Sequence, residues 1–279
     1  MPNDLTAALA ARQLDADAVI QAIGLRPGDV AYVAGSLVDG LGGAAADLDI
    51  FVLTDRAGIE ARRASFDTER MVQQRRHDFG IAYVQAGDTE LDVEFHPVEK
   101  FEALFHALDE MRPVTRSKLW ESFRSLGPYE RPYALELLHR LRRSWPLGNM
   151  DAYAALRARF DEQTFLDWNV LFSLMECEDY TKGTRRSLRE GDPQSACLKL
   201  RYFYDSLVDG ALFSAGESLD RWKWRLPKLR RLGDAALLDD YLSVQLAAPA
   251  YDGAALAEFV TTALGRGLQR HSRLMGRFQ

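Results

Sequence analysis

The sequence predicts an α+β protein in two parts, an α/β domain with a mixed sheet over residues 1–112 and an all-α helical bundle over residues 113–279. In the first part, short apolar runs bounded by turn residues flank a charged helical stretch, as in a sheet covered by helices. In the second part, strand-like alternation disappears and long amphipathic stretches follow one another. The net charge also divides there, −10 over the first range and +4 over the second.

The first part is expected to begin with a helix from Asp4 to about Ile23, which the turn GLRPGD ends. A second, mostly helical stretch is expected between Ile59 and Arg76. Four apolar runs are typical of strands, and the last two form a hairpin-like pair around a GDT turn. The strands are expected at residues 30–35, 48–53, 81–86 and 90–96.

The second part is divided by breaks at LGPYERP, SWPLGN and REGDP. Helices are expected at about 115–125, 131–145, 151–160, 162–190, 193–215, 234–245 and 253–275.

Composition excludes several classes. The chain has 279 residues, of which 47% are hydrophobic and 27% charged, and it has no apolar run of about 18 residues that could span a membrane. The N-terminal stretch carries acids and lacks a continuous apolar core, so we expect no signal peptide and a cytoplasmic protein. Cys177 and Cys197 lie on expected helices without neighbouring metal ligands and are expected to be reduced thiols.

Two carboxylates stand inside an otherwise apolar strand. Asp47 and Asp49 are two residues apart, so their side chains point to the same side of the sheet. Their like charges repel unless a cation lies between them, and Mg²⁺ prefers such oxygen ligands together with substrate phosphates. The alternative is that Asp47 ends a loop and Asp49 is a solvated strand residue.

The segment before this strand fits a phosphate ligand. Gly35 and Ser36 end the preceding strand, and a loop rich in glycine follows. Glycines let the backbone approach anionic oxygens closely, and the Ser36 hydroxyl adds a donor. A third acid is expected from a later strand, where LDVEF supplies Asp92 and Glu94. Either could complete a two-metal site or accept a proton from an acceptor hydroxyl.

This order of motifs over roughly residues 20–100 resembles the polymerase-β-like nucleotidyltransferase superfamily. The resemblance implies that Gly35 and Ser36 contact nucleotide phosphates and that Asp47 and Asp49 bind Mg²⁺, with two ions expected. It implies that the third acid is a metal ligand or a base. Asp92 is the first choice for this acid, and Glu94 stays open. ATP or another nucleoside triphosphate is the implied co-substrate.

The helical half is similar to the second domain of antibiotic nucleotidyltransferases, which implies a substrate-binding role. Basic residues there could complete the triphosphate site, and Lys182 and Lys223 are the candidates. The alternative is that these charges are simply solvated. The resulting hypothesis is transfer of a nucleoside monophosphate, AMP from ATP in the first place, to a hydroxyl of a small molecule with release of pyrophosphate.

Two alternatives stay open. The protein could be a non-catalytic, antitoxin-like member that binds a nucleotide or a protein partner, or an adenylyltransferase that modifies protein or RNA. A nucleic-acid substrate is disfavoured because the chain is acidic overall and has no evident additional RNA-binding module.

Overall fold

The computed structural model describes residues 4–43, 46–65, 71–74, 79–122, 125–246 and 253–278. The chain forms two compact units, and neither is continuous in the sequence. The first unit comprises Met1–Ala107 and Ser125–Asp161, and the second comprises Leu108–Arg124 and Glu162–Gln279.

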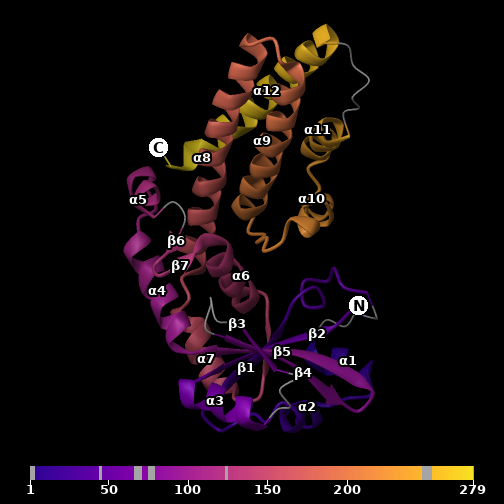
Figure 1. Cartoon of the computed structure of the whole chain (residues 1–279), viewed down its shortest axis with the longest axis vertical. Helices are drawn as coiled ribbons and strands as arrows, with labels where there is room; N and C mark the ends of the chain where they lie inside the picture. The colour runs from indigo at the N-terminus through magenta and orange to yellow at the C-terminus, as the bar shows by residue number, and fades with distance from the viewer. Residues whose placement is uncertain are drawn as a thin grey trace. The chain divides into compact units, whose positions relative to one another are not determined.

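The first unit is built on a mixed sheet, which confirms the expected architecture (Figure 1). Within the described residues its strand order is β3-β4-β5-β2-β1-β8. Strands β2 and β5 run parallel, whereas the other neighbouring strands pair antiparallel. The strands are β1 Val30–Ala34, β2 Leu48–Thr54, β3 Met71–Gln74, β4 Phe79–Ala86, β5 Thr89–Pro97 and β8 Trp145–Leu147.

One face of this sheet is apolar. Alternate residues of the central strands, including Val33, Ile50 and Val93, form its core together with residues of the helices on that face. The helices are α1 Leu5–Ala10, α2 Ala16–Ala22 and α3 Arg56–Ser65. The opposite face of the same strands carries buried aromatic side chains, such as Tyr32 and Phe51, together with the polar residues of β2 and β5.

The rest of the first unit is formed by a part of the sequence that was expected in the helical domain. Residues 125–161 cluster with the sheet because β8 pairs with β1 and because α6 and α7 contact β1. These additional elements are α4 Glu99–Met111, which runs on into the second unit, β6 Ser125–Leu126, β7 Tyr129–Glu130, α6 Arg131–Arg142 and α7 Met150–Arg159.

The second unit is helical, as expected. A long antiparallel pair, α8 and α9, forms its centre, and α10, α11 and α12 pack against α9. Its helices are α5 Arg116–Glu121, α8 Glu162–Arg189, α9 Pro193–Ser214, α10 Arg225–Leu232, α11 Ala235–Gln245 and α12 Gly253–Met275, with short 3₁₀ turns η1 Trp222–Trp224 and η2 Gly276–Phe278.

Some expected elements were wrong in detail. The helix expected from Asp4 to Ile23 is two helices, because Gln13 has a positive φ of 58° and the Asp15 side chain caps a new helix at Ala18 N. The second expected helical stretch ends at Ser65, and β3 lies within its remainder. Helices α4 and α10 and strands β6, β7 and β8 were missed; the strands are too short for alternation to show.

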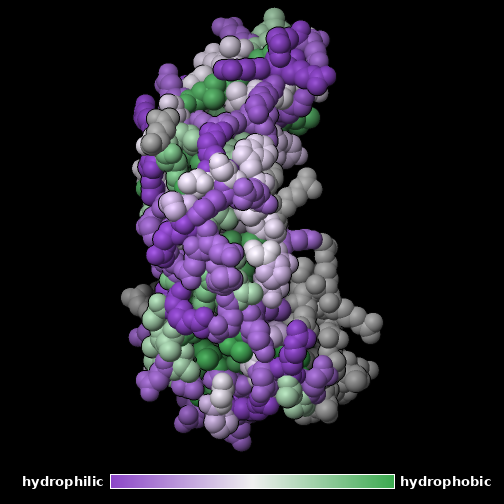
Figure 2. Space-filling model, turned by 90° about the vertical axis from the view of Figure 1, so that its left-hand side faces the viewer, coloured by the Kyte–Doolittle hydropathy of each residue, from purple (hydrophilic) through white to green (hydrophobic). Residues whose placement is uncertain are grey.

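The surface agrees with this division between core and exterior. The face drawn in Figure 2 is mainly hydrophilic, and its hydrophobic residues occur in small separate groups. Among the helices that the structure describes, none has the length and apolar character needed to cross a membrane.

Candidate functional site

Two of the expected acids lie side by side at the polar face of the sheet. Asp49 on β2 is the Cα partner of Asp92 on the parallel strand β5, and it is also the partner of Ala34 on β1. Partners in a sheet register point to the same face, so the carboxylates of Asp49 and Asp92 share that face. Both side chains are partly exposed.

Glu94 occupies the next position of β5 on the same face. Its Cα partner on β2 is Phe51, and its Oε2 lies 2.9 Å from Nε2 of His96. Burial lowers the pKa of the His96 imidazole, against the opposing effect of Glu94. A neutral imidazole can donate a hydrogen bond to Glu94, so this carboxylate already has a partner within the protein.

Asp92 is electrostatically distinct. Burial, followed by the charges of Asp49 and Glu94, raises its pKa from 3.8 to about 6. Its Oδ1 is buried and has no hydrogen-bond partner among the described residues. A buried carboxylate oxygen without a donor is costly, and a bound cation or a proton would relieve that cost.

Gly35 brings the backbone against this acid pair. Its φ is +86°, a left-handed value, and a Cβ added to it would overlap the Asp49 carboxylate. Only glycine therefore allows β1 to end so close to Asp49. The adjacent Ser36 is half-buried, and its carbonyl accepts hydrogen bonds from Leu41 N at 2.9 Å and Gly42 N at 2.8 Å.

The loop after Ser36 is anchored to helix α6 through a buried aspartate that sequence reasoning did not single out. Asp39 is 3% exposed, and its two carboxylate oxygens lie 3.2 Å from His139 Nε2 and 2.9 Å from Arg143 Nε. The loop that carries Gly35 and Ser36 is thus fixed to α6 on the polar side of the sheet.

Arg140 of α6 is a second residue that sequence reasoning missed. Its side chain is 4% exposed, and Nη1 lies 3.6 Å from Asp49 Oδ2. Its guanidinium also lies 5.3 Å from the centre of the Phe51 ring, which faces the same side of the sheet. The run HRLRR within a leucine-rich helix is the signal that could have identified it, since cations are seldom buried without a partner.

Beyond Glu94, the polar face continues into a row of linked side chains that are buried or half-buried. Tyr133 of α6 lies 3.4 Å from His96 Nδ1, and its hydroxyl accepts a hydrogen bond of 2.7 Å from Lys100 Nζ. Lys100 is 2% exposed and also lies over the rings of Phe79 and Tyr133. These contacts hold Glu94 and His96 in a fixed arrangement next to Asp92.

The third predicted metal ligand is more loosely placed. Asp47 precedes β2 and is exposed, and Arg12 Nη2 donates to the neighbouring carbonyl of Ala46 at 2.6 Å. Within the described residues, no group of three or more His, Cys, Asp or Glu side chains is arranged to hold a metal ion. The donor set nevertheless suits Mg²⁺, which often takes only one or two protein carboxylates. Asp49 and the unpartnered oxygen of Asp92 could serve as these two.

The two predicted phosphate-binding lysines lie in the second unit. Lys182, on α8, is exposed and its Nζ lies 3.1 Å from Asp179 Oδ1. Lys223, in η1, lies with its Nζ 4.8 Å from the centre of the Trp224 ring. Their role in nucleotide binding stays a prediction.

Comparisons with known proteins add a similarity of structure only. No family model matches the sequence, and no curated protein matches it. Over 98% of its length, the chain is similar to the crystal structure of a nucleotidyltransferase-like protein from Exiguobacterium sibiricum 255-15, of which it covers 78%, with a TM-score of 0.49 and 12% sequence identity.

Proposed function

We propose that the chain is a Mg²⁺-dependent nucleotidyltransferase that transfers a nucleoside monophosphate to a hydroxyl of a small molecule and releases pyrophosphate. AMP from ATP is the first choice for the transferred group. The observation that carries this proposal is the register of Asp49 with Asp92 beside the side-chain-free backbone of Gly35. It combines two oxygen ligands with an anion-binding turn on one sheet face.

The residues of the site have different proposed roles according to their positions. Asp49 and Asp92 would hold Mg²⁺, with the exposed Asp47 turning toward it when the nucleotide arrives. The metal would supply positive charge against the triphosphate and the departing pyrophosphate. Gly35 and the Ser36 hydroxyl would bind phosphate oxygens, and the Asp39 anchor would keep their loop in position.

Asp92 is the better-supported third acid. Its Oδ1 lacks a partner within the described residues, whereas Glu94 accepts from His96. Burial and the charges of Asp49 and Glu94 raise the pKa of Asp92 to about 6 in the chain without metal, and a bound cation would relieve the cost of holding this carboxylate ionised. Glu94 then acts as a positioning residue for His96 and for the charge of Asp92.

The test is release of pyrophosphate from ATP, GTP, CTP and UTP in the presence of Mg²⁺ and candidate aminoglycoside or other hydroxyl acceptors. Asp49→Asn and Asp92→Asn should reduce turnover at least a hundredfold, and Glu94→Gln should reduce it less. Asp88→Asn is the matched control, because Asp88 is an exposed acid in the turn before β5. Full turnover in Asp49→Asn would overturn the proposal.

A second candidate is a protein of this fold that binds nucleotide without transferring it. The ion pair between Arg140 and Asp49 favours it, since Arg140 supplies a positive charge where a metal would otherwise be needed. A titration of ATP with and without Mg²⁺, run beside the pyrophosphate assay, separates the two candidates. Nucleotide binding without Mg²⁺ and without turnover would support the binding protein, and Arg140→Gln should then abolish binding.

The predicted roles of Lys182 and Lys223 are tested in the same assay. If each contacts phosphate, Lys182→Ala and Lys223→Ala should raise KM for the nucleotide about tenfold with little effect on kcat. Unchanged KM in both variants would assign these lysines to the solvated surface.

A further inference from the structure

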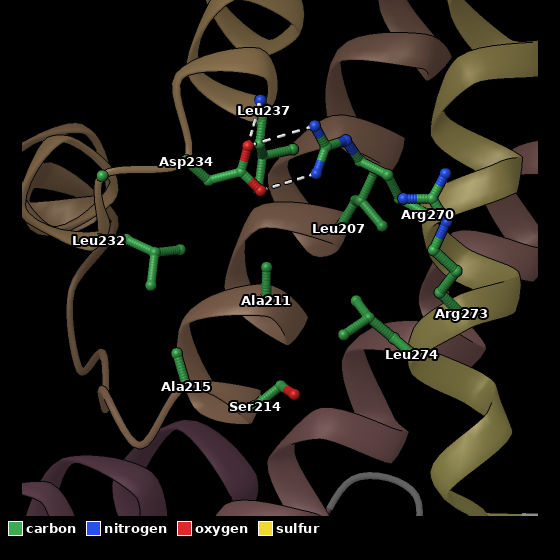
Figure 3. A pocket seen from close by; sticks show the side chains of 11 residues that line it. Leu207, Ala211, Ser214, Ala215, Leu232, Asp234, Leu237, Arg270, Arg273 and Leu274 are labelled. Atoms are coloured by element: carbon green, nitrogen blue, oxygen red, sulfur yellow. Dashed lines mark hydrogen bonds and ion pairs between the residues drawn. The ribbon is translucent and has the colours of Figure 1, made fainter.

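A cavity of about 440 Å³ lies within the second unit, between α9, the turn from α10 to α11, and α12 (Figure 3). This volume is in the range of about 300 to 1,000 Å³ that is typical of small-molecule sites. All of its lining residues belong to the helical unit. The cavity is therefore a feature separate from the acids of the sheet, and nothing in the proposed transfer reaction uses it.

The cavity has an apolar floor. Leu207 and Ala211 of α9 line it from one side, and Leu232, at the end of α10, and Leu274 of α12 line it from the others. Apolar side chains around an open cavity gain free energy when an apolar ligand displaces the water there. The floor thus suits the hydrocarbon or aromatic body of a ligand.

Two arginines of α12 give the cavity its charge. Arg270 and Arg273 are three residues apart and so lie on the same face of the helix. Arg270 donates to both carboxylate oxygens of Asp234, at 2.7 and 3.2 Å, and Asp234 in turn caps α11 at Leu237 N. One of the two positive charges is thereby neutralised within the protein, as the dashed lines in Figure 3 show.

Arg273 differs from its neighbours. It has no hydrogen bond or ion pair with any residue that the structure describes, and its side chain is exposed. By comparison, Arg277 in η2 pairs with Asp167 and with the Ser214 hydroxyl. Arg273 is thus a cation beside an apolar cavity whose remaining charges cancel, and it leaves the lining with one net positive charge.

We propose that this cavity binds a small amphipathic organic anion, with its apolar body against the leucines and its acid group against Arg273. A guanidinium can pair with a carboxylate or phosphate through two parallel hydrogen bonds. Because the Arg273 side chain is exposed, solvent screens that pair in part, and burial of the ligand's apolar body against the leucines supplies the remaining affinity. An ammonium group at the same place would meet the like charge of Arg273, and a neutral polar group would gain only one ordinary hydrogen bond.

The experiment is isothermal titration calorimetry of the full chain with three probes of equal length, decanoate, decanol and decylammonium. Decanoate should bind saturably with one site per chain and about tenfold more tightly than decanol, and decylammonium should show no saturable binding. Because the acceptor and the nucleotide are absent from this titration, its outcome does not depend on the proposed transfer reaction.

Two variants locate the site. Arg273→Gln should weaken decanoate binding about tenfold and leave decanol binding unchanged. Ala211→Phe should abolish binding of both by filling the floor, and Ala211→Leu replaces it if Ala211→Phe lowers Tm by more than a few degrees. Arg189→Gln, an equal loss of charge at an exposed position on α8, should change nothing.

Several results would overturn the proposal. They are no saturable decanoate binding to the unmodified chain, decanol binding as tight as decanoate, an Arg273→Gln variant that binds decanoate normally, or an equal loss in Arg189→Gln. The last result would show a general charge effect in place of a specific contact.

Discussion

Asp49 and Asp92 are direct Cα partners on the parallel strands β2 and β5, with their carboxylates on one face of the sheet. Parallel pairing in this register places two negative charges next to each other. This arrangement is unfavourable because the charges repel and the carboxylates are partly removed from water. Burial of Asp92, followed by the charges of Asp49 and Glu94, raises its pKa to about 6. The pair therefore makes the sheet less stable by itself and is suited to a positively charged ligand.

The first prediction concerns stability against pH in the presence of a metal chelator. The pKa of Asp92 is about 6 in the folded chain and near 3.8 in the unfolded chain. The folded state therefore binds the proton more tightly than the unfolded state. The contribution of Asp92 to the free energy of unfolding is therefore highest below pH 3.8, falls as pH rises toward 6, and stays low above it. We expect Asp92→Asn to raise that free energy at pH 7.5 by about 1 to 2 kcal/mol, allowing for solvent screening of a partly exposed group.

Urea denaturation at pH 7.5 and pH 4 measures this effect. Most of the gain in Asp92→Asn should be lost at pH 4, where the wild-type carboxyl group is protonated in the folded chain. Asp88→Asn is the control and should leave the difference between the two pH values unchanged. An Asp92→Asn variant less stable than wild type at pH 7.5 would contradict the assigned pKa.

The second prediction separates backbone strain from steric overlap at Gly35. Both Gly35 and Gly40 have positive φ, at +86° and +68°, but a Cβ would overlap the Asp49 carboxylate only at Gly35, and no described atom lies within 4 Å at Gly40. Gly40→Ala should cost about 1 kcal/mol for the left-handed conformation. Gly35→Ala should cost at least about 1 to 2 kcal/mol more, because Asp49 or β1 must move.

Thermal or urea denaturation of the two alanine variants gives this difference. Equal destabilisation by Gly35→Ala and Gly40→Ala would show that the Asp49 carboxylate yields freely. In that case the close approach of Gly35 would not help to position Asp49.

The third prediction concerns the anchor between the loop after Ser36 and α6. Asp39→Ala leaves His139 and Arg143 without their buried carboxylate, and removing one partner of such a buried pair costs about 3 to 5 kcal/mol. We expect a value near the lower bound, since Arg143 is partly exposed. Asp151→Ala, at an exposed acid in the first turn of α7, should cost less than about 1 kcal/mol.

Activity distinguishes a positioning role of Asp39 from a purely structural one. If Asp39 holds the loop for the nucleotide, Asp39→Asn should raise KM for ATP more than it lowers kcat at temperatures where the variant is folded. Unchanged KM in a folded Asp39→Asn variant would assign the anchor to stability alone.

The fourth prediction concerns Arg140, which lowers the pKa of Asp92 through its charge. Removing that charge in Arg140→Gln should move the acidic limb of the pH profile of kcat/KM to higher pH, since Asp92 would hold its proton more tightly. The control is Arg142→Gln, the loss of an arginine two residues further along α6. A profile that moves equally in both variants would indicate a general charge effect.

Part of the candidate site could be proposed from the sequence because its signals are local. One short segment contains Gly35, Ser36, Asp47 and Asp49. Two acids in an apolar strand can be recognised in the sequence whatever strand they pair with. The pairing of Asp49 with Asp92 could not be read in the same way, because register depends on how β2 and β5 dock through the core. Strand order and the parallel direction are tertiary properties of the same kind.

The contribution of α6 was missed for a different reason. Arg140 and His139 lie in a leucine-rich helical stretch, and a helical period indicates which face is buried without indicating what it faces. Residues 125–161 were therefore expected in the helical bundle. Strand β8 comprises only Trp145–Leu147 and contains a proline. It is too short for its sequence to indicate that the chain returns to the sheet.

The most direct test of the central claim is calorimetric titration of ATP into the wild-type chain and Asp49→Asn, each with Mg²⁺ and with a chelator. We predict saturable binding to wild type that requires Mg²⁺ and becomes at least about tenfold weaker in Asp49→Asn, a loss of about 1.4 kcal/mol or more. Binding of equal strength in the chelator, or in Asp49→Asn, would contradict the assignment of Asp49 and Asp92 to a metal–nucleotide site.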